Sequence, residues 1–196
     1  MTRTERFLAK LEAGDVLLAD GACGTMLHGK GLEMGKVPES WLLERPEQVC
    51  SLHQAYVDAG SDVILTCTFG GTRFRLESNG LAAQVLEVNR RATELARSVA
   101  GDGAFVGGDM GPTGQLLAPL GTVSTEEAIA AFAEQAAGLA EGGADFLLIE
   151  TMSDLSEARA AVLGARQASD LPIFCTFSFD SHGRTMMGVK PAQAAR

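Results

Sequence analysis

Five short apolar runs recur along the chain, and each ends in polar residues. They fall within residues 15–20, 59–69, 104–109, 142–152 and 171–179. The runs are apolar on both faces, which is typical of parallel strands buried under helices. Helical patterns lie between some of them, with apolar positions three to four residues apart and a glycine after the last turn. The clearest cover residues 46–60 and 125–143, and a further helix is expected near the N-terminus. This alternation predicts an α/β fold with a parallel sheet and right-handed crossovers.

One structural unit occurs twice in the sequence. The segments AGSDVILTCTF (59–69) and GGADFLLIETM (142–152) both have small residues, an aspartate, an apolar run and then threonine or Glu-Thr. A helical pattern precedes each of them. Before the second, Ser124 or Thr125 is expected to cap the helix by accepting hydrogen bonds from its first free amides.

The predicted strands carry polar side chains at their C-terminal ends. These are Asp20, Thr66, Thr68, Asp109, Glu150, Ser178 and Asp180. In α/β barrels and in open parallel sheets alike, this edge holds the active site. A binding or catalytic site is therefore expected where these residues meet.

The length of the chain leaves two architectures open. Five βα units fit an open, flavodoxin-like sheet, whereas a (βα)8 TIM barrel typically needs about 250 residues. The chain has 196 residues, and its last segment, GVKPAQAAR, indicates the start of another helix. We therefore expect residues 1–196 to form one barrel-type domain of about five βα units, truncated before the sixth strand or completed by another chain.

The composition of the chain indicates which classes of binding partner are improbable. The net charge is −9 and the sequence pI is about 4.8, which argues against nucleic acid and anionic membrane surfaces. No apolar run reaches the roughly 18 residues of a membrane span, and the charged N-terminal segment does not resemble a signal peptide. A cytoplasmic location is expected, and because thiols are normally reduced there, so are the four cysteines, none of which lies in a CxxC pair.

Asp20 and Glu150 are the main candidate site residues. If both point into one mouth, they can hold an ammonium group by charge-assisted hydrogen bonds. The alternative is that Asp20 caps the following turn and Glu150 pairs with an arginine. The spacing alone leaves both interpretations open.

Other motifs carry weaker signals. The glycine- and proline-rich loop of residues 108–121 either cradles an anion or forms a rigid pocket wall. Cys23, Cys67 and Cys175 lie on or near strands and are either zinc ligands or apolar filler, and their spacings match no metal motif. His53 is expected to be a surface or half-buried packing residue. No histidine has a Ser or Cys partner at a spacing diagnostic of a hydrolase.

Five strings together resemble the homocysteine S-methyltransferase family from about residue 15 to residue 190. They are DGACGTML, PESWLLERPEQVCSLHQAYVDAGSDVILTCTFGGTRFRLESNGL, VGGDMGPTG, GGADFLLIETMSDLSEARAA and FSFDSHGRTMMG. The family includes betaine–homocysteine methyltransferase and the homocysteine-binding module of cobalamin-dependent methionine synthase. Each string is moderately specific, and their common order makes the resemblance strong.

The resemblance implies a (βα)8 barrel that transfers a methyl group to the thiol of homocysteine, giving methionine. It also implies a zinc ion that holds this thiol as thiolate. Asp20, Gly21 and Glu150 match positions that bind the amino-acid end of homocysteine. Thr68 and Phe69 match the segment that lines the pocket. The methyl donor, whether betaine or a methylcobalamin, stays open, and no residue is assigned as catalytic.

The sequence departs from the family pattern at several points. Cys67 stands where the family usually has asparagine in TNTFG, and Cys23 is also unusual. The family's zinc-ligand motifs, GxNC and GGCCG, do not occur, so zinc ligands are expected outside this chain. The partners expected are therefore an amino-acid thiol, a complementary chain or a corrinoid protein, and the chain is expected to form an oligomer. The alternatives are a non-catalytic binding or accessory subunit, or a methyltransferase for another thiol or methylated amine.

Overall fold

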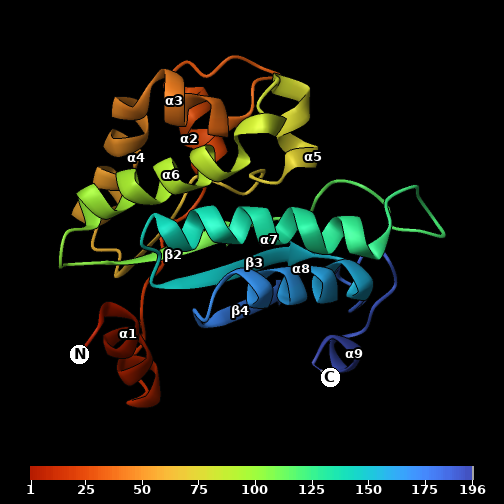
Figure 1. The fold of residues 1–196 in the computed structure, drawn as a ribbon. Helices are drawn as coiled ribbons and strands as arrows, with labels where there is room; N and C mark the ends of the chain where they lie inside the picture. Colours follow the sequence, from red (N-terminus) through yellow and green to blue (C-terminus); the bar gives the residue numbers. More distant parts are fainter. Residues whose placement is uncertain (196) are drawn as a thin grey trace.

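The computed structural model describes residues 1–195, and its centre is a four-stranded parallel sheet (Figure 1). The strands are β1 (Val63–Leu65), β2 (Phe105–Met110), β3 (Phe146–Met152) and β4 (Ile173–Phe177), in that order across the sheet. They pair with Val63 opposite Phe105, Gly107 opposite Phe146 and Leu147 opposite Ile173. Sequential order with parallel pairing requires each connection to cross over in the same direction, as in a barrel wall.

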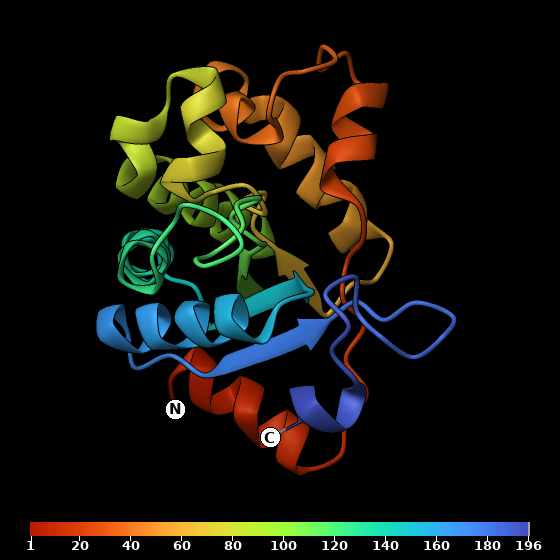
Figure 2. The same cartoon turned by 90° about the vertical axis from the view of Figure 1, so that its right-hand side faces the viewer.

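Four longer helices follow or precede these strands and pack side by side. They are α4 (Pro46–Asp58), α6 (Val85–Ala100), α7 (Thr125–Glu141) and α8 (Leu155–Ala168). Helix α4 packs on α6, α6 on α7 and α7 on α8, so they form one outer layer along the sheet (Figure 2). An open doubly wound sheet would carry such helices on both faces. The single layer therefore favours the barrel-type arrangement over the open sheet.

Shorter elements cover the two ends of the sheet. The remaining α-helices are α1 (Arg3–Glu12), α2 (Cys23–Gly29), α3 (Trp41–Glu44), α5 (Arg73–Leu76) and α9 (Pro191–Ala194), and 3-10 turns lie at Pro38–Ser40, Glu77–Asn79 and Ala82–Gln84. Helix α2 was not among the helices expected from the sequence. Within residues 1–195, no helix combines the length and the apolar character that a membrane crossing requires.

The expected strand at residues 15–20 was wrong as a regular element. This segment runs beside β1 but forms only one isolated bridge, between Ala19 and Val63. The Leu18 amide donates to the Asp62 carboxylate (2.9 Å) instead of to a backbone carbonyl, and two successive amides donate to the Leu18 carbonyl. Val16 is 94% exposed. The Asp62 side chain has therefore replaced one backbone hydrogen bond of the expected strand pairing. Residues 15–20 also do not have two buried faces.

The N-terminal end of the sheet is closed by phenylalanine side chains. Phe7 of α1 stacks on Phe146 with ring centroids 4.3 Å apart and nearly parallel planes. Phe105 and Phe174 meet Phe7 edge-on. Helix α1 is itself capped by a reciprocal pair of hydrogen bonds between Thr2 and Glu5. This cluster fixes α1 beneath the sheet, where Figure 2 shows it.

Two local predictions met different outcomes. Ser124 caps α7 as expected, accepting from the Glu127 amide while the Glu127 carboxylate accepts from the Ser124 amide. His53 was expected to be at the surface or half buried, and this was wrong, because its side chain is fully buried in α4. The apolar positions that surround a helical histidine do not by themselves indicate how deep it lies.

Candidate functional site

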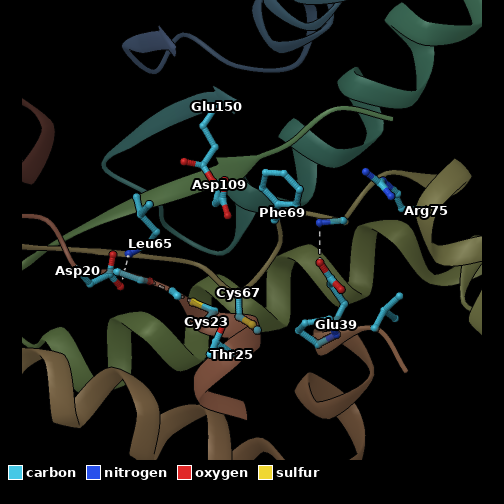
Figure 3. Close-up of a pocket in the computed structure, with 16 residues that line it drawn as sticks. Asp20, Cys23, Thr25, Glu39, Leu65, Cys67, Phe69, Arg75, Asp109 and Glu150 are labelled. Carbon is cyan, nitrogen blue, oxygen red and sulfur yellow. Dashed lines mark hydrogen bonds between the residues drawn. The ribbon is translucent and has the colours of Figure 1, made fainter. Parts of the chain in front are cut away.

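A cavity of about 510 Å³ lies at the C-terminal ends of β1, β2 and β3 (Figure 3). Its walls come from the segment that leads into α2, from the turn before α3, from the loop after β1 and from the ends of β2 and β3. Carboxylates gather in it, namely Asp20, Glu39, Asp109 and Glu150. Among the polar strand-end residues, Asp20, Asp109 and Glu150 share this cavity as predicted, whereas those that do not line it are Thr66, Thr68, Ser178 and Asp180.

Asp20 is held by the backbone of β1 and keeps one oxygen free. Its Oδ2 accepts a hydrogen bond from the Leu65 amide (3.0 Å), whereas its Oδ1 is buried without a partner among the described residues. Burial, supported by the charge of Glu150, raises the pKa of Asp20 to about 7, although the Leu65 amide acts in the opposite direction. Asp20 does not cap α2, so the turn-cap alternative is wrong.

Glu150 reaches the same cavity through an irregular strand end. The pairing of β3 with β4 shifts register between Ile149 and Met152, which marks a bulge at this point. The following residue, Thr151, has a positive φ of 60°, a conformation that a β-branched residue adopts only under constraint. Bulges re-aim side chains, and Figure 3 shows Glu150 directed into the cavity beside Asp109. Burial raises the pKa of Glu150.

Asp109 lies deeper than Asp20 or Glu150. Its side chain is 6% exposed, and its Oδ1 has no partner within residues 1–195. Burial first, and then the charges of Glu150 and other nearby acids, raise its pKa well above the usual value. A buried carboxyl without a hydrogen-bond donor is costly. The cavity therefore favours an incoming group that carries positive charge and N–H donors.

Glu39 is a site residue that the sequence analysis missed. It is 2% exposed, its Oε1 accepts from the Gly70 amide (2.6 Å), and its Oε2 has no partner in the described chain. Burial raises its pKa. A glutamate after proline in a turn is usually solvated, so nothing in the sequence indicates that this one is buried. Arg75, a cation on the wall of this cavity, was also missed.

The other predicted site residues have different locations. Gly21 and Phe69 line the cavity, and Tyr56 supports the segment around Gly21 by donating to the Ala22 carbonyl (3.1 Å). Thr68 does not line it. Its hydroxyl is buried, pairs with Thr66 (2.6 Å) and donates to the Asp109 carbonyl (2.7 Å). Thr68 therefore fixes the β1–β2 edge, and a direct contact between its side chain and a ligand is not supported.

Comparison with known proteins identifies the family of this chain. The model of the family described as homocysteine S-methyltransferase matches residues 17–196. The chain belongs to the homocysteine S-methyltransferase family. This match covers both the cavity and the sheet, so the strand-end carboxylates lie within the family's own domain.

Named relatives agree with this assignment. The chain is 33% identical to methionine synthase of Mycobacterium leprae (strain TN) over 190 residues, and 32% identical to that of Mycobacterium tuberculosis (strain ATCC 25618 / H37Rv) over 212. The alignments cover 88% and 96% of this chain but only 16% and 18% of those proteins. The chain thus spans less than a fifth of these two relatives.

A solved structure has the same fold. The metallated form of the homocysteine methyltransferase MmuM from Escherichia coli matches with a TM-score of 0.80 and 25% identity. The match covers 93% of this chain and 69% of that one. MmuM is a TIM barrel, so the four-stranded sheet corresponds to part of a (βα)8 wall.

Zinc does not fit the side chains of this homocysteine S-methyltransferase chain. Within residues 1–195, no group of three or more His, Cys, Asp or Glu side chains is arranged to hold a metal ion. Cys23 and Cys67 lie on the cavity, but Cys175 is exposed on β4 and lines a different hollow. A zinc site built from these three cysteines is therefore wrong.

A second cavity of about 460 Å³ adjoins the first and shares Phe69 and Arg75 with it. The predicted loop of residues 108–121 supplies part of its wall, including Pro112 and Leu117. Gly111 begins this loop at a point where a side chain would lie 2.5 Å from the Phe69 carbonyl. This arrangement agrees with the prediction that residues 108–121 form a rigid pocket wall.

Proposed function

We propose that the first cavity binds homocysteine, with the substrate ammonium group between Asp20 and Glu150. On this proposal the chain supplies the substrate-binding part of a methyltransferase that converts the thiol of homocysteine to the thioether of methionine. The single observation that supports it is the convergence of these two carboxylates on one cavity in a chain of this family.

The electrostatics of the cavity support an ammonium ligand. Asp20 Oδ1 and Asp109 Oδ1 lack partners in the described chain, and the nearby charges repel one another. An ammonium group donates up to three hydrogen bonds and offsets this repulsion. Its arrival favours the ionised form of Asp20, so affinity should rise as pH increases through about 7.

The groups that activate the thiol are proposed to lie outside residues 1–195. The described residues contain no metal cluster, so the family's metal would need ligands from elsewhere. A further segment is also proposed to pair with β4, which contacts only β3 in the described sheet and has exposed residues such as Cys175. That segment could belong to the same polypeptide or to a partner, including a corrinoid-binding one. A cytoplasmic location is consistent with the four free thiols of the described residues.

Calorimetry with homocysteine under reducing conditions tests the binding proposal. Asp20→Asn and Glu150→Gln should each weaken binding by about 2 kcal/mol, roughly 30-fold, because each removes a charge-assisted hydrogen bond. Glu134→Gln is the matched control, since Glu134 pairs with Arg73 away from the cavity. Equal affinity in the wild-type chain and in both cavity variants would refute the proposal.

A second candidate is a binding or accessory role without turnover. The lack of a metal cluster in residues 1–195 favours it for this chain alone. Saturable homocysteine binding, with no methyl transfer to homocysteine when zinc and a panel of methyl donors are supplied, would distinguish this role from catalysis.

A further inference from the structure

Two thiols meet on the wall of the acidic cavity. Cys23 is the first residue of α2, and Cys67 follows β1, so they come from separate segments of the chain. Figure 3 shows the sulfur atoms of Cys23 and Cys67 near each other, and Cys23 is the first cause of the raised pKa of the Cys67 thiol. Both residues line the cavity. The methyl-transfer proposal uses neither of them.

The two thiols differ in access. Cys67 is 3% exposed and packs among buried residues such as Leu42 and Val88, whereas Cys23 is only partly buried. Cys23 is loosely held, since the hydrogen bond that its thiol donates to the Gly21 carbonyl is long, at 4.0 Å. A small solute that enters the cavity therefore reaches Cys23 first and finds Cys67 directly behind it.

We propose that Cys23 and Cys67 form a reversible dithiol–disulfide pair, oxidised by a small peroxide that enters the cavity. Cys23 Sγ attacks one oxygen of hydrogen peroxide, the O–O bond breaks, and water leaves as Cys23 becomes a sulfenic acid. Cys67 Sγ then attacks that sulfur, the S–S bond forms, the S–O bond breaks and a second water leaves. The two thiols lose two electrons in total, and one peroxide becomes two waters.

The surroundings set the rate of this chemistry. The neighbouring Cys23 thiol, burial and the charges of Glu39 and Asp109 raise the pKa of the Cys67 thiol. The Cys67 thiolate, which attacks in the second step, is therefore scarce, and this step is slower than it would be in a positive environment. The proximity of the sulfur atoms compensates in this step, because an intramolecular attack has a high effective concentration.

The disulfide also changes the cavity. An S–S bond ties the start of α2 to the loop after β1, and these two segments form adjacent parts of the cavity wall. The segment that carries Asp20 and Gly21 leads directly into Cys23, so its position changes with the bond. Resting on the proposed function, this predicts that the oxidised chain binds the amino-acid ligand more weakly.

Peptide mapping after peroxide treatment tests the pair itself. The chain is treated in metal-free buffer, unreacted thiols are alkylated, and the digest is analysed without reduction. The expected product is a Cys23–Cys67 linked peptide, with Cys50 and Cys175 still unlinked, and dithiothreitol should restore free thiols. Cys23→Ser should abolish the linked peptide, and Cys175→Ser, on exposed β4, should leave it unchanged. Full alkylation of Cys23 and Cys67 after Cys175 has been oxidised would overturn the proposal.

Binding measurements then test the consequence. Methionine replaces homocysteine as the probe, because its thioether cannot reduce the disulfide. The oxidised wild-type chain should bind methionine at least roughly tenfold more weakly than the reduced chain, and oxidised Cys23→Ser should show no change. Unchanged affinity in a fully linked sample would refute the effect on the cavity. Failure of the reduced chain to bind methionine would instead contradict the proposed function, while the mapping would still decide whether the pair forms.

Discussion

At the two ends of the parallel sheet, the side chains have opposite kinds of surroundings. At the N-terminal end, Phe7 lies among Phe105, Phe146 and Phe174 and is 4% exposed, so apolar surface is buried against apolar surface. At the C-terminal end, three carboxyl groups each keep a buried oxygen without a partner in residues 1–195. One end of the sheet therefore stabilises the fold, whereas the other holds groups that destabilise it until a ligand arrives.

The largest expected effect comes from the aromatic end. Phe7→Ala should lower the free energy of unfolding by about 4 kcal/mol, because it removes a buried ring and leaves a cavity. Urea unfolding at pH 7 measures this loss, and methionine affinity should not change under conditions where the variant is folded. Leu11→Ala is the control, since Leu11 lies on the same helix at 38% exposure. A loss below about 1 kcal/mol for Phe7→Ala would contradict a stabilising role of this end.

A buried histidine remote from the aromatic cluster is expected to make the stability of the fold depend on pH. His53 is fully buried, both ring nitrogens lack partners in the described chain, and burial lowers its pKa to about 4. The folded state keeps it neutral, while the unfolded state binds a proton below about 6.5. Its contribution to stability is therefore complete above pH 6.5 and is lost as pH falls towards 4, by about 3 kcal/mol in total.

Unfolding measured from pH 7 to pH 4 checks this contribution. His53→Leu should lose stability less steeply with acid than the wild-type chain, whereas His182→Leu, in an exposed turn, should follow the wild type. Parallel curves for wild type and His53→Leu would show that His53 does not titrate as the structure implies.

A smaller effect, with the opposite sign, is expected at the acidic end. The folded-state pKa of Asp20, about 7, lies above its ordinary value of 3.8, so its ionisation destabilises the fold as pH rises from 4 through 7. The free energy of unfolding of Asp20→Asn should therefore be about 2 kcal/mol higher than that of the wild-type chain at pH 8. This figure allows for the partial exposure of Asp20 and for its hydrogen bond to the Leu65 amide.

The gain in stability from Asp20→Asn should shrink as pH falls towards 4. Urea unfolding of both chains across this range measures it, with Asp15→Asn, an exposed residue of the same segment, as the control. A variant that is less stable than wild type at pH 8 would mean that Asp20 is a structural anchor and not a strained site group.

Much of the sheet could be predicted from the sequence, because its strands are apolar on both faces and are followed by clear stop signals. The segments containing β2, β3 and β4, and the helices α4 and α7, occur where the pattern predicts them. The prediction of a regular strand at residues 15–20 was wrong because the Asp62 side chain takes the place of a backbone acceptor. The pattern of apolar and polar residues does not reveal such a substitution.

The candidate site was predictable only in part. Asp20, Asp109 and Glu150 share the position that parallel topology gives to strand ends, so their convergence follows from the alternation of elements. Glu39 does not, because its burial depends on how the turn before α3 packs against Gly70. The proximity of Cys23 and Cys67 likewise depends on the position of α2, a helix that the glycine-rich sequence did not suggest.

Recognition of an ammonium group by the cavity carboxylates can be tested by removing that group from the ligand. Calorimetry at pH 8 compares methionine with N-acetylmethionine, which keeps the side chain and the carboxylate but has no ammonium. The wild-type chain should bind methionine at least roughly 30-fold more tightly, and Asp20→Asn should reduce this preference. Equal affinity of the wild-type chain for the two compounds would contradict this recognition.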